Sequence, residues 1–429
     1  MKWLLQVIIV ALTSMYIFPI EFVFLPALNT KMIMAVLGVG VFIINSILKR
    51  EEILPKKVTN AALLAIGVSL IGLVSVLYNG TSDYTYASYF ISFIVWIFAA
   101  YFVINCIRIV HAKVSIIIVC NYLIAVAISQ CVLAIMLDPI PIFKEAVNSV
   151  VVGFASMFSA GDGLEKAGRL YGIGAALDVA GTRFCAILSI IGILVYKSYR
   201  DDCRILQYTY MLLFGVLLVV GSMISRTTGV GCIFIILYYL FVVSKEKQSR
   251  LFFVQLGFCL AILIVLVSFL YNHNAFFYNN FRFAFEGFFN YFEQGEWRLN
   301  STDPLKVMYV FPDSFKTWLI GDAYFDEPYV VDPYYVGEVK NKGLFYMGTD
   351  VGYIRFLYYF GVPGLAMFIL YFITITKNCI SDFPNYKWIF IAFLMMNLLI
   401  WFKVATDIFC LFALFLCFTQ SNEDLETHI

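Results

Sequence analysis

Five arginines lie on or near the side of the chain that we place outside the membrane, and most of them touch a long apolar stretch, where charged side chains are rare. They are Arg169, Arg183, Arg226, Arg298 and Arg355. A guanidinium at such a position is expensive unless it snorkels to the membrane surface or pairs. Its planar fork matches phosphate oxygens, and it keeps its proton. Several such arginines at one face of a membrane therefore favour a polyanionic ligand held at the membrane boundary.

The residues around three of these arginines suggest how each would act. Arg169 lies in Gly168-Arg169-Leu170-Tyr171-Gly172, where small residues let the backbone approach a ligand closely; snorkelling to lipid headgroups is the alternative. Arg183 lies five residues after Asp178 and could pair with it. Arg226 lies in Ser225-Arg226-Thr227-Thr228-Gly229, a turn whose hydroxyls suit phosphate, although an ordinary turn between spans would look the same.

A carboxylate offers a second kind of chemistry at the start of a later apolar stretch. Asp350 stands five residues before Arg355. Three interpretations are open: Asp350 forms an ion pair with Arg355, it caps the helix that begins there, or it is a catalytic carboxylate.

Other kinds of site are excluded by what the chain lacks. The three histidines are His111, His273 and His428, and only His273 lies on the outer side in the orientation given below, so a histidine-rich zinc site is excluded. There is no phosphate-cradling Walker loop and no dinucleotide fingerprint. We therefore predict no metal and no cofactor. None of the ten cysteines lies in an outer segment, so they are interpreted as small buried residues and not as disulfides.

The chain that carries these residues has the composition of a membrane protein. Of its 429 residues, 62% are hydrophobic and 13% are charged, against roughly 45 to 50% and about 25% in globular proteins. No soluble fold hides that much apolar surface. The formal net charge of +1 argues against a nucleic-acid partner, because no basic stripe is available to neutralise many phosphates.

About twelve apolar stretches are candidates to cross a hydrocarbon core of ~30 Å. The predicted fold class is therefore all-α, a polytopic transmembrane helix bundle of about twelve spans with one large exterior loop. We place the spans near 3–20, 29–48, 60–78, 87–107, 114–137, 170–196, 206–224, 229–243, 251–270, 351–376, 388–402 and 404–419.

Lysines and arginines concentrate in alternate gaps between these spans, beginning with Lys49, Arg50, Lys56 and Lys57. By the positive-inside rule those gaps, and both termini, face the cytoplasm. The first span lacks a small-residue cleavage site and is kept as an anchor. The outer side then holds 138–169, the turn at 225–228 and the long loop 271–349.

Four sequence segments follow from this topology: 1–137 with the first five spans, 138–270 with the central spans and outer arginines, the large loop 271–349, and 350–429 with the last spans and a cytoplasmic tail. The loop is richer in Phe, Tyr and Trp than the 18% of the whole chain. Its stretch 276–289 suits a helix lying in the membrane interface. Such a helix would be a simple aromatic anchor or a platform for sugar rings or a lipid carrier.

The order of these features resembles the O-antigen polymerase and O-antigen ligase superfamily of bacterial envelope glycosyltransferases, over most of 150–375. The resemblance rests on short motifs that appear in the same order: Gly168-Arg169-Leu170-Tyr171-Gly172, Ser225-Arg226-Thr227-Thr228-Gly229, Arg298, Trp318-Leu319-Ile320-Gly321-Asp322, and Asp350-Val351-Gly352-Tyr353 leading to Gly361-Val362-Pro363-Gly364.

The resemblance implies a GT-C-like fold and a reaction at the outer face of the plasma membrane. A sugar chain carried on undecaprenyl pyrophosphate passes to an acceptor hydroxyl, and the lipid pyrophosphate leaves. Arg169 and Arg298 would stabilise the departing pyrophosphate without a metal. Further ligands for the pyrophosphate or the sugar would be Arg226, Arg183, Arg355, Glu293 and Asp303.

The same resemblance bears on the base and on the class of reaction. Ligases of the superfamily have a histidine near the position of Asp350, so a carboxylate there favours a polymerase. Asp350 would be the general base for the acceptor hydroxyl, with Glu293, Glu296 and Asp303 as rivals. The proline and asparagine that usually follow the Arg169 motif are replaced around Leu177-Asp178-Val179.

The sequence thus predicts an integral polymerase of the bacterial inner membrane. It would join undecaprenyl-pyrophosphate-linked repeat units of an O-antigen, as in lipopolysaccharide, or of a capsule or similar polysaccharide, with a chain-length regulator as a further partner. One alternative is an O-antigen ligase that transfers glycan to lipid A core. The other is a transporter or flippase of lipid-linked oligosaccharides, for which internal repeats and midplane charges are typical; we find no such repeat.

Overall fold

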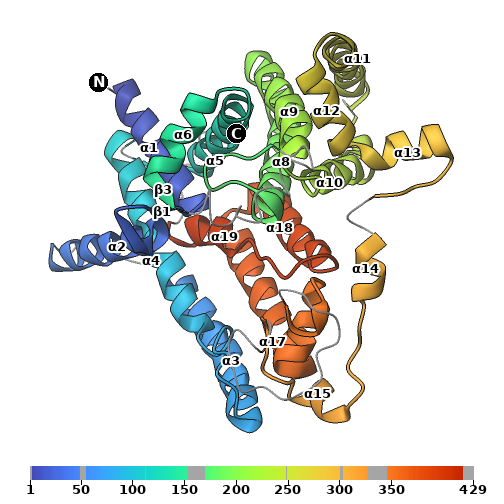
Figure 1. Ribbon diagram of the computed structural model, residues 1–429. Helices are drawn as coiled ribbons and strands as arrows, with labels where there is room; N and C mark the ends of the chain where they lie inside the picture. The colour runs from blue at the N-terminus through green and yellow to red at the C-terminus, as the bar shows by residue number, and fades with distance from the viewer. Residues whose placement is uncertain are drawn as a thin grey trace. The chain divides into compact units, whose positions relative to one another are not determined.

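The computed structural model describes residues 2–48, 55–111, 113–152, 170–247, 249–299, 303–326, 328 and 345–418. These residues are mostly helical (Figure 1). The helices are α1 (Lys2–Ile17), α2 (Thr30–Ile47), α3 (Lys56–Asn79), α4 (Tyr89–His111), α5 (Ile116–Leu137), α6 (Pro141–Val150), α8 (Leu177–Arg200), α9 (Arg204–Ile224), α10 (Thr228–Phe241), α11 (Ser249–His273), α12 (Ala275–Ala284), α13 (Glu286–Gln294), α14 (Asp303–Met308), α15 (Phe315–Leu319), α17 (Gly352–Asp382), α18 (Lys387–Ile400) and α19 (Phe409–Leu416), with 3-10 turns η1 (Val243–Lys245), η2 (Tyr346–Gly348) and η3 (Pro384–Tyr386).

Nine helical stretches in the described part of the chain are long and apolar enough to cross a membrane. They are α2, α3, α4, α5, α8, α9, α10 continued through η1, α11 and α17. The prediction of a multi-pass helical membrane protein is therefore confirmed. The other three predicted spans correspond to α1, α18 and α19, which are shorter; α19 has only 8 residues.

The chain forms two compact units, and each combines stretches that are distant in sequence. Unit 1 comprises Met1–Ile33 and Cys106–Trp297, and unit 2 comprises Met34–Asn105 and Arg298–Ile429. The large predicted loop contributes to both units. The four predicted segments therefore describe the order of the sequence and do not coincide with these units.

Unit 1 is built around α8, in which 94% of the apolar stretch is buried. Figure 1 shows α8, α9 and α10 in green, side by side, and α5 also packs on α8. Small residues permit this close packing. A Cβ added to Gly231 of α10, for example, would lie 2.4 Å from the carbonyl oxygen of Cys185 in α8. By contrast, only Ser249 and Phe252 of α11 are buried.

A small antiparallel sheet in unit 1 was not predicted. Strand β1 (Glu21–Phe22) pairs with β2 (Leu25–Asn29) on one side and with β3 (Val151–Val152) on the other. Strands β1 and β3 have two residues each, too few to show the alternation of apolar and polar side chains by which a strand is recognised. Strand β2 is longer, but its first four residues are all exposed.

The predicted sixth span begins later than expected, at Leu177 and not near residue 170. Gly174 and Leu177 both have positive φ, of 70° and 50°, so the backbone before α8 is not helical. The side chain of Gln130 in α5 accepts from the Ile173 N–H at 2.8 Å and donates to the Ile173 carbonyl at 2.9 Å. A Cβ on Gly172 would lie 2.2 Å from the Gln130 Oε1, so Gly172 makes room for Gln130. A ligand was the expected occupant of that space.

In unit 2, α17 is kinked where the sequence reads Phe360-Gly361-Val362-Pro363. Gly361 has φ 67° and ψ −171°, and Pro363 has no N–H to donate to the Tyr359 carbonyl four residues earlier. That carbonyl instead accepts from the Ser75 hydroxyl at 2.7 Å and from the Ala323 N–H at 3.1 Å. At this kink, the Tyr359 carbonyl of α17 therefore binds both α3, through Ser75, and the late part of the long loop, through Ala323.

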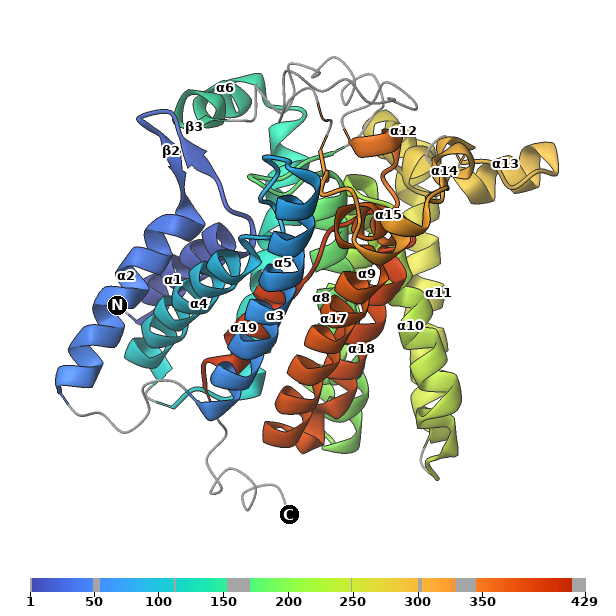
Figure 2. The same cartoon turned by 90° about the horizontal axis from the view of Figure 1, so that it is seen from below.

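The chain end of unit 2 is fastened by a buried lysine. Lys57, in the first turn of α3, is 8% exposed and pairs with Asp382 at the end of α17. Its ammonium also donates to the carbonyls of Phe415 and Phe418, each at 2.9 Å. Figure 2 shows α17 and α18 running side by side in this unit.

Candidate functional site

The predicted site residues are distributed over both units. Arg183, Arg226 and Glu293 belong to unit 1, and Arg298, Asp350 and Arg355 belong to unit 2. Arg169 lies outside the described residues, and of Asp303 only the backbone is described, at the start of α14. The predicted convergence of the five arginines therefore stays a prediction, and the surroundings of each are given within its own unit.

Arg183 lies in the second turn of α8 and is only 7% exposed. The carbon at the centre of its guanidinium is 5.4 Å from the centre of the Phe18 ring. Nε and Nη1 are buried, and neither has a hydrogen-bond partner among the described residues. The expected pairing with Asp178 is therefore not made through these two atoms. A guanidinium this deep is costly without a partner.

The start of α8 carries an acid of its own, Asp178, in the first turn, and the N-cap residue, Ala176, makes no side-chain hydrogen bond to that turn. The positive end of the helix therefore already has one carboxylate in its first turn. The turn 225–228 packs against the same end: a Cβ on Gly181 would lie 2.3 Å from the Ser225 hydroxyl and 2.8 Å from the Thr227 Cβ. Gly181 thus brings two hydroxyl residues close to α8.

Arg226, in that turn, is already bound by the protein. Its Nη2 lies 2.6 Å from a Glu286 carboxylate oxygen, and its Nε donates to the Phe283 carbonyl at 2.9 Å. The guanidinium also lies over the Phe283 ring, 4.1 Å from its centre. Arg226 thus joins the turn between α9 and α10 to α12 and α13, and a phosphate would have to compete with Glu286 for it.

Glu293, a predicted sugar ligand and rival base, forms a two-pronged pair with Arg282 at 2.8 and 2.6 Å. These hydrogen bonds hold the pKa of Glu293 below its ordinary value and raise the pKa of Arg282. A carboxylate with a lowered pKa is a weaker general base. The geometry therefore favours a role for Glu293 in fastening α13 to α12.

The predicted interfacial helix at 276–289 is two helices, α12 and α13, which meet at Phe285. Both lie at one end of α11 (Figure 2). On one side their rings stack on Tyr271, whose centre is 5.7 Å from that of Phe289. On the other side Phe288, Phe292 and Trp297 are more than half exposed. This exposed aromatic face fits either predicted role, an interfacial anchor or a platform.

Arg355 is held in unit 2 much as Arg226 is held in unit 1. It is 6% exposed and lies between two rings, 3.5 Å from the centre of Phe325 and 3.7 Å from that of Phe345. Its Nη2 donates to the Phe325 carbonyl at 3.0 Å and to Asp326 at 3.2 Å. Its Nε is buried without a hydrogen-bond partner among the described residues.

Asp350 is half-buried just before α17 and lies within electrostatic reach of Arg355. The N-cap of α17 is Val351, and its N–H donates to the Thr349 hydroxyl at 3.2 Å. The interpretation of Asp350 as the N-cap is therefore wrong, because the helix begins one residue later. Arg298 is exposed in the irregular segment after α13.

Two carboxylates beside Arg355 were not singled out by the sequence. Asp326 pairs with Arg355. Burial raises the pKa of Asp326, and the nearby carboxylate of Asp83 raises it further, although Arg355 acts in the opposite direction. Asp83 is 3% exposed and accepts from the Phe325 N–H at 2.8 Å. A half-buried carboxylate with a raised pKa is a candidate for proton transfer. The only sequence signal for Asp326 was its place between aromatic residues and a further acid.

Asp322, in the late-loop motif, is fully engaged in holding α15. It accepts from Lys316 at 2.5 Å, from the Thr317 hydroxyl at 2.7 Å and from the Tyr346 hydroxyl at 3.2 Å. Lys316 also donates to Asn79 at the end of α3, at 2.8 Å. The motif therefore has a structural explanation within unit 2.

In the described ranges, no group of three or more His, Cys, Asp or Glu residues is placed to hold a metal ion. Comparison of the chain with protein-family models, with curated proteins and with solved structures found no match. The surroundings of the arginines and carboxylates are thus the observations from which a function can be argued.

Proposed function

We propose that this chain is a glycosyltransferase of the bacterial inner membrane, GT-C-like in fold, that polymerises undecaprenyl-pyrophosphate-linked repeat units of a polysaccharide on the outer face. Arg183 carries the proposal. Its guanidinium is buried, and two of its nitrogens lack hydrogen-bond partners in the part of the chain that the structure describes. The leaving group of this reaction is a diphosphate, the kind of anion that such a guanidinium binds most strongly.

The proposed reaction is a displacement at the anomeric carbon of the donor. The acceptor hydroxyl oxygen forms a bond to that carbon and passes its proton to Asp350 as general base. The bond from the anomeric carbon to the pyrophosphate oxygen breaks, and its electron pair leaves with the diphosphate. Arg183, with Arg169 and Arg298, stabilises the charge that develops there.

Arg226 and Arg355 are assigned a different part in this proposal. Each is bound to a carboxylate of the long loop, Glu286 or Asp326, and to the carbonyl of a phenylalanine under its guanidinium. They position the loop segments beside the spans, and they contact substrate only if it displaces those carboxylates. A chain-length regulator is a further proposed partner.

The test is polymer formation in cells that depend on this chain. Arg183→Ala should lower polymer yield by about 10² to 10³, the usual effect of removing one preorganised donor to developing charge. Arg200→Ala is the matched control, because Arg200 lies at the other end of α8 and its side chain is 59% exposed. Normal polymer from Arg183→Ala, at normal protein level, would defeat the arginine mechanism.

The intermediate that accumulates separates the proposal from its alternatives. Loss of a polymerase leaves single repeat units, which a ligase attaches to lipid A core. Loss of a ligase leaves long polymer on undecaprenyl pyrophosphate, and loss of a flippase leaves single units on the cytoplasmic face. Long lipid-linked polymer, or units trapped inside, would overturn the assignment as polymerase.

A further inference from the structure

The two acids of helix α13 are both held by arginines of neighbouring elements. Glu286 lies 2.6 Å from Arg226, in the turn before α10, and Glu293 forms its two-pronged pair with Arg282 of α12. Because seven residues make nearly two turns of helix, both acids lie on the same side of α13. The charged side of this helix is therefore turned toward the protein.

The opposite side of α13 is aromatic. Phe288 lies three residues before Tyr291 and four before Phe292, so the three rings share one face of the helix. All three side chains are more than half exposed, and Phe292 is 81% exposed; we call them the aromatic face of α13. An amphipathic helix on a water-soluble protein turns its apolar side to the core and its charges to water, whereas α13 has the reverse arrangement.

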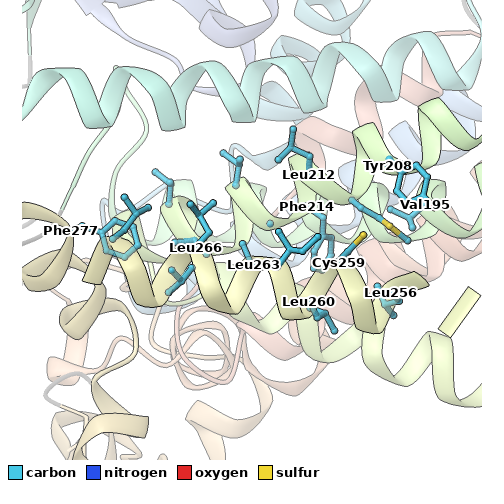
Figure 3. Close-up of a pocket in the computed structure, with 18 of the residues that line it drawn as sticks. Val195, Tyr208, Leu212, Phe214, Leu256, Cys259, Leu260, Leu263, Leu266 and Phe277 are labelled. Atoms are coloured by element: carbon cyan, nitrogen blue, oxygen red, sulfur yellow. The ribbon is translucent and has the colours of Figure 1, made fainter. Parts of the chain in front are cut away.

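The helix that leads toward α13 faces lipid. α11 is long and apolar enough to cross a membrane, and only Ser249 and Phe252, near its start, are buried. An apolar cavity of about 360 Å³ lies between α11 and its neighbours α9 and α10, so protein contacts hold α11 loosely (Figure 3). Most of the surface of α11 is therefore available to the bilayer.

Short connections place the aromatic face at the end of this lipid-facing helix. Only Asn274 separates α11 from α12, and only Phe285 separates α12 from α13. Figure 2 shows α13 running across the direction of α11. The aromatic face thus continues the lipid-facing surface at the level where α11 leaves the hydrocarbon core.

The chemistry of the aromatic face favours lipid over a glycan. Tyrosine is enriched where a membrane meets water, and interfacial helices carry phenylalanine on the side that they bury. A glycan would need hydrogen-bond partners for its hydroxyl groups, but the carboxylates of α13 lie on the other side of the helix and are already paired.

We propose that the aromatic face of α13 lies in the boundary between lipid head groups and acyl chains, in the leaflet where α11 ends, and anchors the end of α11 there. The partner is the lipid surface itself. The proposal goes beyond the polymerase reaction and does not depend on it, because neither a glycan nor a lipid carrier takes part. It assigns to Arg226 and Arg282 the task of holding α13 in the orientation that directs its rings to lipid.

The test measures the depth of a nitroxide label in vesicles of phosphatidylethanolamine and phosphatidylglycerol. The full chain carries p-acetylphenylalanine in place of Phe292, to which a hydroxylamine nitroxide is coupled, so the native cysteines stay unmodified. Electron paramagnetic resonance then compares collisions with oxygen, which concentrates in hydrocarbon, and with a neutral nickel chelate, which stays in water. The matched control carries the label in place of Gln294, an exposed residue two positions further along α13 that does not share the aromatic face.

We expect the ratio of oxygen to nickel collisions to be about tenfold higher at position 292 than at position 294, because interfacial helices bury their apolar face by about 5 to 10 Å. A label in place of Phe288 should give the same result, and it replaces the first variant if that one does not fold. Equal ratios at positions 292 and 294 would show that water covers the face and would overturn the proposal. Few collisions with either reagent at position 292 would show that a protein surface covers it, with the same consequence.

A second measurement tests the anchoring of α11. Phe288→Ser combined with Phe292→Ser should raise amide hydrogen exchange at residues 268–273 about tenfold in the same vesicles, because that end of α11 has no buried residue of its own. Gln294→Ser is the control and should leave this exchange unchanged. The same exchange in both variants would contradict the anchoring role.

Discussion

Arg183 and Arg226 lie on elements that touch at one end of α8, but the two guanidinium groups differ in their hydrogen-bond partners. Arg226 has a carboxylate, a carbonyl and a ring around it. For two nitrogens of Arg183, none of the described residues supplies a hydrogen-bond partner. A protein retains such an unsatisfied charge at a cost, which is why we assign Arg183 to the ligand and Arg226 to the scaffold.

This difference predicts opposite effects on stability. Arg183→Met removes a buried donor without a partner and should leave the ligand-free protein unchanged or more stable by about 1 to 3 kcal/mol, although polymer is lost. Arg226→Met removes the arginine partner of the mostly buried Glu286 and should destabilise by about 3 to 5 kcal/mol. Thermal unfolding of the purified chain in detergent measures both. A large loss of stability in Arg183→Met would show that the protein itself uses this guanidinium.

At the level of single residues, the sequence shows where the arginines lie and does not show what they contact. An arginine in an apolar stretch is visible in the sequence. Its partners are not, because Glu286 and Asp326 are only two of the many acids of the long loop. The raised pKa of Asp326 likewise arises from burial beside Asp83, a residue from a distant gap between spans.

Among the elements, the kink in α17 brings two glycine-containing motifs into contact. Gly321 and Gly361 both have positive φ and pack against each other's chain segments: a Cβ on Gly321 would lie 2.4 Å from the Tyr359 carbonyl oxygen, and one on Gly361 would lie 2.7 Å from the Leu319 carbonyl. Two motifs that appear separate in the sequence therefore form one contact.

Gly361→Ala should destabilise unit 2 strongly. Its φ of 67° and ψ of −171° belong to a region that is nearly exclusive to glycine and costs about 1 to 3 kcal/mol for other residues; the clash with Leu319 adds to this. Gly257→Ala is the control, because it lies in α11 with no atom within 4 Å of the added Cβ, and should stabilise by up to about 1 kcal/mol. Equal thermal unfolding of the two variants would contradict the kink geometry.

The pair between α12 and α13 predicts a dependence on pH. Arg282 lowers the pKa of Glu293 below its ordinary value of 4.5, so the carboxylate gives up its proton more readily in the folded state. The resulting stabilisation is fully present above pH 4.5 and is lost as the pH falls through the lowered value. Hydrogen exchange of α13, corrected for intrinsic rates, should rise in that acidic range.

Glu293→Gln should abolish this pH dependence of α13 exchange, and Glu296→Gln should retain it. A pH profile that is the same in both variants would show that another group titrates there.

Element positions were largely predictable, since each predicted apolar stretch overlaps a helix. Three features were not. Gly174 and Leu177, both with positive φ, delay the start of α8. The short strands β1 to β3 show no alternation of buried and exposed residues. The break at Phe285 divides one expected interfacial helix into two. In each case tertiary contacts, such as that of Gln130 with Ile173, decided the local conformation.

For the whole molecule, orientation in the membrane is the prediction that most others depend on. Native Cys203 is exposed in the gap between α8 and α9, which the positive-inside rule places in the cytoplasm. A membrane-impermeant maleimide should therefore label Cys203 only after the cells are permeabilised. Trp297→Cys in a Cys203→Ser background should be labelled in intact cells. The reverse pattern would invert the topology and remove Arg183 from the outer face.

The two units were not predictable from the sequence, because each joins stretches separated by most of the chain. Hydropathy places spans one after another and carries no information on which of them pack together. The predicted site residues show the same limit: Arg183 belongs to one compact unit and Arg355 to the other, and their predicted convergence stays a prediction.

The buried ammonium of Lys57 has a consequence for biogenesis. Its acceptor at Phe415 is 358 residues further along the chain, so α3 reaches the insertion machinery long before its partners have been synthesised. Unit 1 has all its residues once Trp297 has emerged, but unit 2 must wait for the last helix. Premature stop codons before 382 would leave the Lys57 ammonium without Asp382 and without both carbonyl acceptors, and such truncated products should be cleared by membrane quality-control proteases.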